Sequence, residues 1–122
     1  MCTLEDVRRI ALALPETYER PHRRAPSFWV NERIFCMLPK GDVQDRVSMW
    51  GDAPVVIKLE REDQLNMIEP HPDIVSPAGL YSHHGWTNVA PGAEDEALVR
   101  LLLRLAWMHV APKRLSKMHG RD

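Results

Sequence analysis

Apolar side chains recur every three or four positions in two segments, one near each end of the chain. In the first segment, residues 3–14, the apolar positions are Leu4, Val7, Ile10, Ala11 and Leu14. In the second, residues 93–110, they are Leu98, Leu101, Leu102, Leu105 and Met108. This spacing predicts two helices that each bury one face. A proline follows each segment and ends the helix, because its ring clashes with the preceding turn.

Residues 26–38 have a different pattern, in which two apolar runs flank the polar pair Asn31-Glu32. A helical period does not accommodate this arrangement, whereas a β-hairpin does. We therefore predict strands near residues 27–30 and 33–38, joined by a turn at the polar pair.

The middle of the chain is less regular. Residues 46–50 alternate well enough for a further strand. Residues 54–59 fit either a strand, because three of them are β-branched, or the first turn of a helix, because they begin with proline. We expect a helix over residues 60–68 with Leu65 and Ile68 facing inward.

Two short strands are expected near residues 74–75 and 86–89. Terminal helices with strands between them predict an α+β fold, in which one antiparallel sheet is covered on one face by the N- and C-terminal helices. We expect a single domain over residues 1–122, with residues 113–122 as a mobile basic tail.

Composition narrows the functional classes. The 122 residues are 44% apolar and 27% charged, with a net charge of −1, so no strong overall field attracts nucleic acid or a membrane surface. No apolar run approaches the length of a membrane span, and we expect no membrane partner. Cys2 and Cys36 read as two free thiols in a reducing compartment, and no signal peptide precedes the first helix, so we expect a cytoplasmic location.

Four features of the chain resemble the MmcQ/YjbR family of small bacterial proteins. They are the helix end Ala11-Leu12-Ala13-Leu14-Pro15-Glu16, the hairpin, the segment Val47-Ser48-Met49-Trp50, and Tyr81-Ser82-His83-His84-Gly85-Trp86-Thr87-Asn88-Val89. The Gly-Trp pair after a histidine is the most specific of these, and the resemblance covers about residues 3 to 112. It implies a CyaY-like fold and, from the usual label of the family, DNA binding through hairpins likened to a double wing. No catalytic residues are assigned in the family. Here Val89 is followed at once by Ala90-Pro91-Gly92, so the last strand is short for a wing.

Two basic segments are candidates for phosphate contacts. Arg20, His22, Arg23 and Arg24 precede the hairpin, and Lys113, Arg114, Lys117 and Arg121 stand in the tail. Cations gathered on one surface bind the nucleic-acid backbone. Alternatively, the first segment is a solvated loop balanced by Glu16 and Glu19, and the second is a tail that keeps the protein soluble.

Four tryptophans are many for this length, and an exposed one beside arginines can stack on a base. The hypothesis is noncatalytic binding of nucleic acid, with DNA as the partner, in which one tryptophan stacks on a base and five cations contact phosphates: Trp29, Arg23, Arg24, Lys113, Arg114 and Lys117. The alternative is a small-molecule or protein-binding module that uses the sheet face not covered by helices.

Nothing in the sequence indicates an enzyme. Adjacent histidines in a strand point to opposite faces, so His83 and His84 are a poor pair for a metal ion, and a polar turn is the simpler interpretation. No nucleophile motif or phosphate-binding glycine loop appears. We expect no cofactor, no metal site and a monomeric protein.

Overall fold

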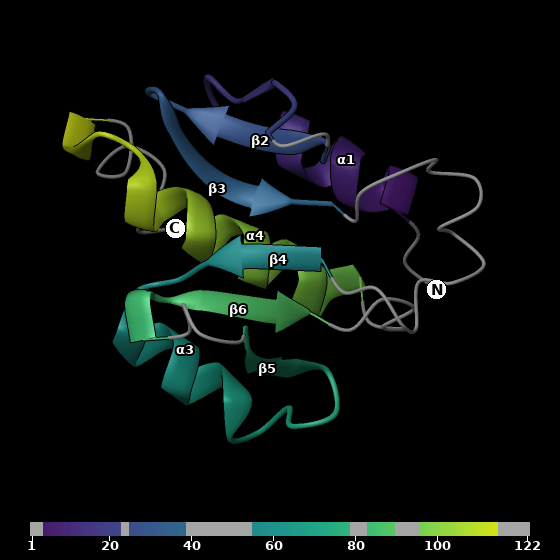
Figure 1. The fold of residues 1–122 in the computed structure, drawn as a ribbon, viewed down its shortest axis with the longest axis vertical. Coiled ribbons are helices and arrows are strands. Elements are labelled where there is room, and N and C mark those ends of the chain that lie inside the picture. Colours follow the sequence, from purple (N-terminus) through teal and green to yellow (C-terminus); the bar gives the residue numbers. More distant parts are fainter. Residues whose placement is uncertain (1–3, 23–24, 39–54, 79–82, 90–95, 115–122) are drawn as a thin grey trace.

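The computed structural model describes residues 4–22, 25–38, 55–78, 83–89 and 96–114. These ranges contain three helices and six strands, and Figure 1 shows how they are arranged. In chain order they are α1 (Leu4–Leu12), β1 (Tyr18–Glu19), β2 (Ser27–Val30), β3 (Arg33–Met37), β4 (Val55–Lys58), α3 (Arg61–Ile68), β5 (Val75–Pro77), β6 (Trp86–Val89) and α4 (Glu96–Val110).

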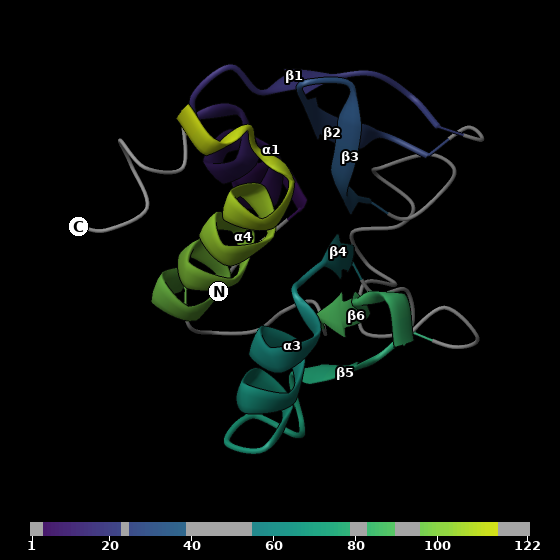
Figure 2. The same ribbon diagram turned by 90° about the vertical axis from the view of Figure 1, so that its left-hand side faces the viewer.

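The strands form one antiparallel sheet in the order β1-β2-β3-β4-β6-β5. The helices α1, α3 and α4 all lie on the same side of this sheet (Figure 2). The long helix α4 packs on β3 and β4, and α1 packs beside it. The predicted α+β architecture, an antiparallel sheet covered on one face by the terminal helices, is confirmed. The predicted strand at residues 46–50 lies outside the described residues.

The predicted hairpin is confirmed as β2 and β3. Its turn residues Asn31 and Glu32 both have positive φ, 53° and 63°, the combination required by a type I′ turn. The pairing register shifts between Phe28 and Trp29, which leaves Phe35 as an extra residue on β3. This bulge allows two successive residues of β3, Phe35 and Cys36, to be fully buried.

The open question at residues 54–59 is resolved in favour of a strand. β4 lies in the middle of the sheet and pairs with β3 on one side and β6 on the other. Its β-branched residues alternate, with Val55 and Ile57 buried against the helices.

The predicted helix at residues 60–68 forms as α3, but its expected orientation was wrong in part. Ile68 packs against the core, whereas Leu65 is 52% exposed. Gln64 is fully buried instead, because its amide group is bonded to the backbone and side chain of β6. A polar contact with a distant strand therefore decides which face of α3 turns inward.

The apolar stripe predicted for α4 is also partly wrong. Leu98 and Leu102 are buried as expected, but Leu101 is 45% exposed. The buried face is centred one position further along the helix, on the residues Leu98, Val99, Leu102, Leu103, Ala106, Trp107 and Val110. The core thus lies between α4, α1 and the inner face of the sheet.

Candidate nucleic-acid interface

The sheet has an outer face, opposite the helices, whose residues follow from the strand register. A row of paired residues on the inner face is fully buried: Phe28, Cys36, Ile57 and Thr87. Side chains alternate along strands, so their neighbours point outward. We call the outer face the surface formed by Tyr18, Trp29, Ile34, Met37, Val56, Lys58, Trp86 and Asn88. All eight are only partly buried. Among the described elements, the helices leave this face uncovered (Figure 2).

Trp29 is the centre of a group of polar and aromatic side chains at one edge of the outer face. It pairs with Tyr18 of the edge strand β1, and its Nε1–H donates to the carbonyl oxygen of Arg20 at 2.8 Å. The guanidinium carbon of Arg20 lies 4.2 Å from the centre of the indole, and the His22 ring meets it edge-on at 5.9 Å. These contacts hold the indole in one orientation, so its position is prepared before any ligand arrives.

An acidic residue of the hairpin turn, Glu32, closes this group. It accepts a hydrogen bond from the Tyr18 hydroxyl at 3.1 Å, and its second oxygen lies 3.7 Å from Nη1 of Arg20. The Glu32 side chain is largely exposed, so this ion pair is a weak one. Arg20 is therefore available to a phosphate at a small cost. We call Tyr18, Arg20, His22, Trp29 and Glu32 the Trp29 cluster.

A second cation–aromatic pair lies further along the outer face. Lys58 on β4 is the cross-strand partner of Trp86 on β6, and its Nζ lies 5.6 Å from the centre of that indole. A cation over an aromatic face at this distance is attracted by the ring electrons. The outer face thus carries two tryptophans, each with its own cation.

The predicted phosphate-binding residues are only partly within the described chain. Arg23, Arg24 and Lys117 lie outside it. Lys113 is exposed just after α4. Arg114 forms two hydrogen bonds with the Glu16 carboxylate, at 3.0 and 3.1 Å, which lower the pKa of Glu16 and raise that of Arg114.

This ion pair shows where the start of the basic tail lies. Glu16 stands two residues before Tyr18, so Arg114 is held beside the chain that enters β1. The structure therefore brings the beginning of the tail to the same sheet edge as the Trp29 cluster, on the helix side.

Sequence reasoning missed the pairing of Lys58 with Trp86. The signal was present in part, because the β-branched residues before Lys58 favoured a strand and Trp86 belonged to the Gly-Trp pair. The register between β4 and β6 was needed to bring the two residues together.

The histidines and the described cysteine do not form a catalytic or metal-binding site in the described part of the chain. His83 and His84 are exposed and lie in a turn before β6, as expected, and their ring centres are 4.0 Å apart with the ring planes tilted by 42°. In the described ranges no three His, Cys, Asp or Glu side chains gather as a metal site would require.

The Cys36 thiol is free and fully buried, and burial raises its pKa far above the ordinary value, so it is not a nucleophile. None of the described helices is long and apolar enough to span a bilayer.

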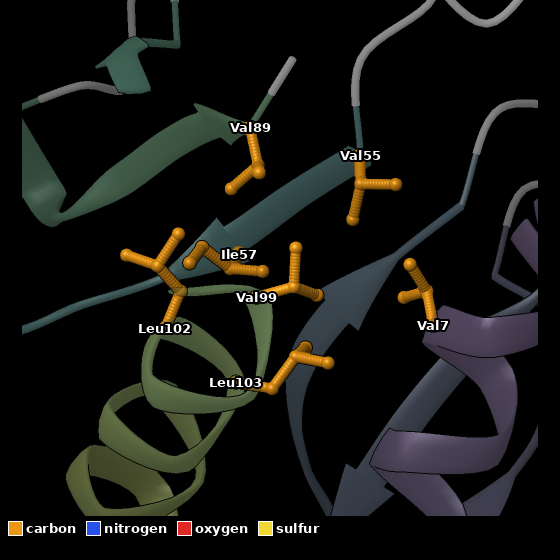
Figure 3. Close-up of a pocket in the computed structure, with 7 residues that line it drawn as sticks. All are labelled: Val7, Val55, Ile57, Val89, Val99, Leu102 and Leu103. Atoms are coloured by element: carbon orange, nitrogen blue, oxygen red, sulfur yellow. The ribbon is translucent and has the colours of Figure 1, made fainter. Parts of the chain in front are cut away.

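An apolar cavity lies inside the core, between α1, α4 and the inner face of β4 and β6 (Figure 3). It is lined by Val7, Val55, Ile57, Val89, Val99, Leu102 and Leu103, and its volume is about 10 Å³. That is room for one water molecule at most, and no polar group lines it. We interpret it as a packing gap and not as a ligand site.

Comparison with known proteins bears on the fold. The family model of YjbR matches residues 12–109. The crystal structure of Deinococcus radiodurans protein DR2400, which has a DUF419 domain, is similar with a TM-score of 0.70 at 22% sequence identity. The similarity covers 100% of this chain and 91% of that one. Comparison with curated proteins gave no match.

Proposed function

The chain belongs to the YjbR family, and we propose that it is a noncatalytic nucleic-acid-binding protein that uses the outer face of its sheet. The observation that carries this proposal is the Trp29 cluster, where an arginine and a partly exposed tryptophan are held together at 4.2 Å. Aromatic rings and arginine planes are the groups on which proteins stack nucleic-acid bases. We propose that the protein acts in the cytoplasm, where a free thiol such as Cys36 persists.

In this proposal the tryptophan and the cations have separate roles. Trp29 stacks on a base, and Arg23, Arg24, Lys113, Arg114 and Lys117 contact phosphates. The Arg114–Glu16 ion pair supports it, because it lies near the β1 edge of the sheet, although it is an exposed pair and therefore a weak one. The same pair reduces the contribution of Arg114 to phosphate binding, because the charge of Arg114 is already balanced by Glu16.

A second candidate function uses the same surface. Ile34, Met37 and Val56 share the outer face with Trp29, and all three are partly exposed. Apolar side chains beside a fixed tryptophan also fit a small apolar ligand or a protein partner. The net charge of −1 does not distinguish this alternative from nucleic-acid binding.

Dependence on salt separates the two candidates. We would titrate fluorescently labelled single-stranded and duplex DNA with the protein at low and high salt, following anisotropy. Nucleic-acid binding should be saturable and weaken steeply with salt, because counterions are released from the phosphates. Absence of binding at low salt, where charge interactions are strongest, would sink this function and favour the alternative.

A matched pair of arginine variants tests the site itself. Arg20 and Arg100 have equally exposed side chains, 49% and 50%, and each is paired with one glutamate. Arg20→Gln should weaken DNA binding several-fold, whereas Arg100→Gln, on the helix side, should leave it unchanged. Glu32→Gln should strengthen binding, because it removes the negative charge nearest Arg20. Equal effects of the two arginine variants would place the site elsewhere.

A further inference from the structure

We propose that the ligand of the outer face is a single-stranded nucleic acid, which crosses the strands from Trp29 on β2 to Trp86 on β6. This inference rests on the proposed function and adds the class of nucleic acid and its path. Its basis is that the two cation–tryptophan pairs lie in one row of the sheet.

The row follows from the register. On the inner face, Phe28, Cys36, Ile57 and Thr87 are aligned across four neighbouring strands. One residue further along each strand, in the same direction, stand Trp29 on β2, Lys58 on β4 and Trp86 on β6. Between them Ile34 of β3 is paired with Trp29. The outer face therefore presents an ordered row, which we call the stacking row: Tyr18, Trp29, Ile34, Lys58 and Trp86.

The spacing of the row suits a flexible strand. Trp29 and Trp86 are three strand-to-strand steps apart, which is roughly 14 Å along the sheet. Both indoles lie on the outer face of the sheet, with Arg20 beside Trp29 and Lys58 beside Trp86. A single strand can place one base on each ring while its phosphates pass Arg20 and Lys58.

A duplex fits this surface less well. Paired bases are stacked on one another inside a helix, so aromatic rings on a flat face cannot reach between them without distorting it. Reading the major groove requires a protruding helix or β-ribbon, and the described helices all lie on the opposite side of the sheet (Figure 2). The described elements of the outer face offer rings and two cations, the composition of a single-strand site.

The test compares a labelled oligothymidine of about 12 nucleotides with a duplex of the same length, using the wild-type protein and the Trp86→Leu, Trp86→Phe and Lys58→Gln variants. The single strand should bind at least about 10-fold more tightly than the duplex. Trp86→Leu should weaken single-strand binding about 5-fold or more, and Trp86→Phe should retain most of it, because it keeps a ring. Lys58→Gln should reduce the salt slope by about 0.7, the value of one phosphate contact on a single strand. Circular dichroism establishes that each variant is folded.

The other outcomes separate this inference from the function on which it rests. If the duplex binds as tightly as the single strand, nucleic-acid binding stands and the single-strand inference is overturned. If Trp86→Leu and Lys58→Gln bind like the wild type, the path across the sheet is wrong. If neither nucleic acid binds at low salt, both proposals fall together.

Discussion

The indole Nε1–H of Trp107 donates a hydrogen bond to the carbonyl oxygen of Pro15 at 3.0 Å. The two residues are 92 positions apart, so this bond joins the last helix to the turn that follows the first one. Trp107 is also among the largest fully buried side chains. Pro15 lies in the turn three residues after the end of α1, and its carbonyl oxygen is satisfied by a side chain of α4.

Replacing Trp107 with phenylalanine should destabilise the protein by on the order of 2 kcal/mol. The smaller ring leaves a gap, and the Pro15 carbonyl loses its partner in the core. Urea denaturation followed by circular dichroism measures the change. The control is Leu101→Ala on the exposed side of the same helix, which should cost less than about 1 kcal/mol. A Trp107→Phe variant as stable as the wild type would show that the bond contributes little.

Gln64 and Leu65 offer a second comparison, within one turn of α3. The Gln64 amide donates to the Trp86 carbonyl at 3.0 Å and to Oγ1 of Thr87 at 2.9 Å, and its oxygen accepts from Arg61 at 2.6 Å. Gln64→Leu keeps the size but leaves buried partners unsatisfied, which should cost about 1–3 kcal/mol in unfolding free energy.

Leu65→Ala is the control for that experiment, because Leu65 is 52% exposed. Its effect should stay within about 0.5 kcal/mol, as for most surface substitutions. A larger loss at Leu65 than at Gln64 would mean that α3 presents the opposite face to the sheet.

These neighbours also show why part of the fold could be predicted and part could not. The hairpin was predictable because Asn31-Glu32 and the flanking apolar runs are adjacent in the sequence, and a type I′ turn depends on local conformation. The inward face of α3 was not, because it depends on Thr87, 23 residues away. A helix turns 100° per residue, so a one-residue error exchanges the buried Gln64 for the exposed Leu65.

The candidate site also has features that the sequence shows and features that only the three-dimensional structure shows. Phe28 and Trp29 are neighbours in one predicted strand, so the sequence shows that one of them faces away from the core, and the burial of Phe28 in the structure shows that it is Trp29. The pairing of Lys58 with Trp86 spans 28 residues and requires the register of two strands that are not consecutive in the chain. Arg114 was recognised as a cation, but its neutralisation by Glu16, 98 residues away, requires the packed helix ends.

Gly85, the residue before Trp86, is predicted to be essential for stability. Its φ is +95°, and a Cβ at this position would overlap the carbonyl oxygen of Leu59. The close approach allows Leu59 N–H to bond the Gly85 carbonyl at 2.9 Å, where β4 and β6 meet. Gly85→Ala should therefore destabilise by on the order of 3 kcal/mol, from backbone strain and the displaced strand end.

Thermal denaturation measures the effect of Gly85→Ala, with Ser76→Ala on the exposed side of β5 as the control. The control should unfold within a few degrees of the wild type. An alanine at position 85 that leaves the unfolding temperature unchanged would contradict the close approach of β4 and β6. It would also remove the structural explanation for the Gly-Trp pair.

His109, in the last turn of α4, should make stability depend on pH. Burial lowers its pKa below the ordinary 6.5, and the charges of Lys58 and Arg33 lower it further, against the opposite influence of Glu60 and Asp63. As pH falls through 6.5, the unfolded chain binds the proton before the folded chain does, so the free energy of unfolding decreases. The decrease ends once the pH is below the folded-state pKa.

NMR titration of the His109 ring measures that pKa directly, and urea denaturation above and below pH 6.5 measures the loss of stability. His109→Asn should remove its part of the pH dependence, because the side chain no longer titrates. Lys58→Gln should raise the pKa of His109 toward its ordinary value, since it removes one of the two cations. A His109 pKa at or above 6.5 in the wild type would reverse the sign and show that the carboxylates of Glu60 and Asp63 outweigh burial.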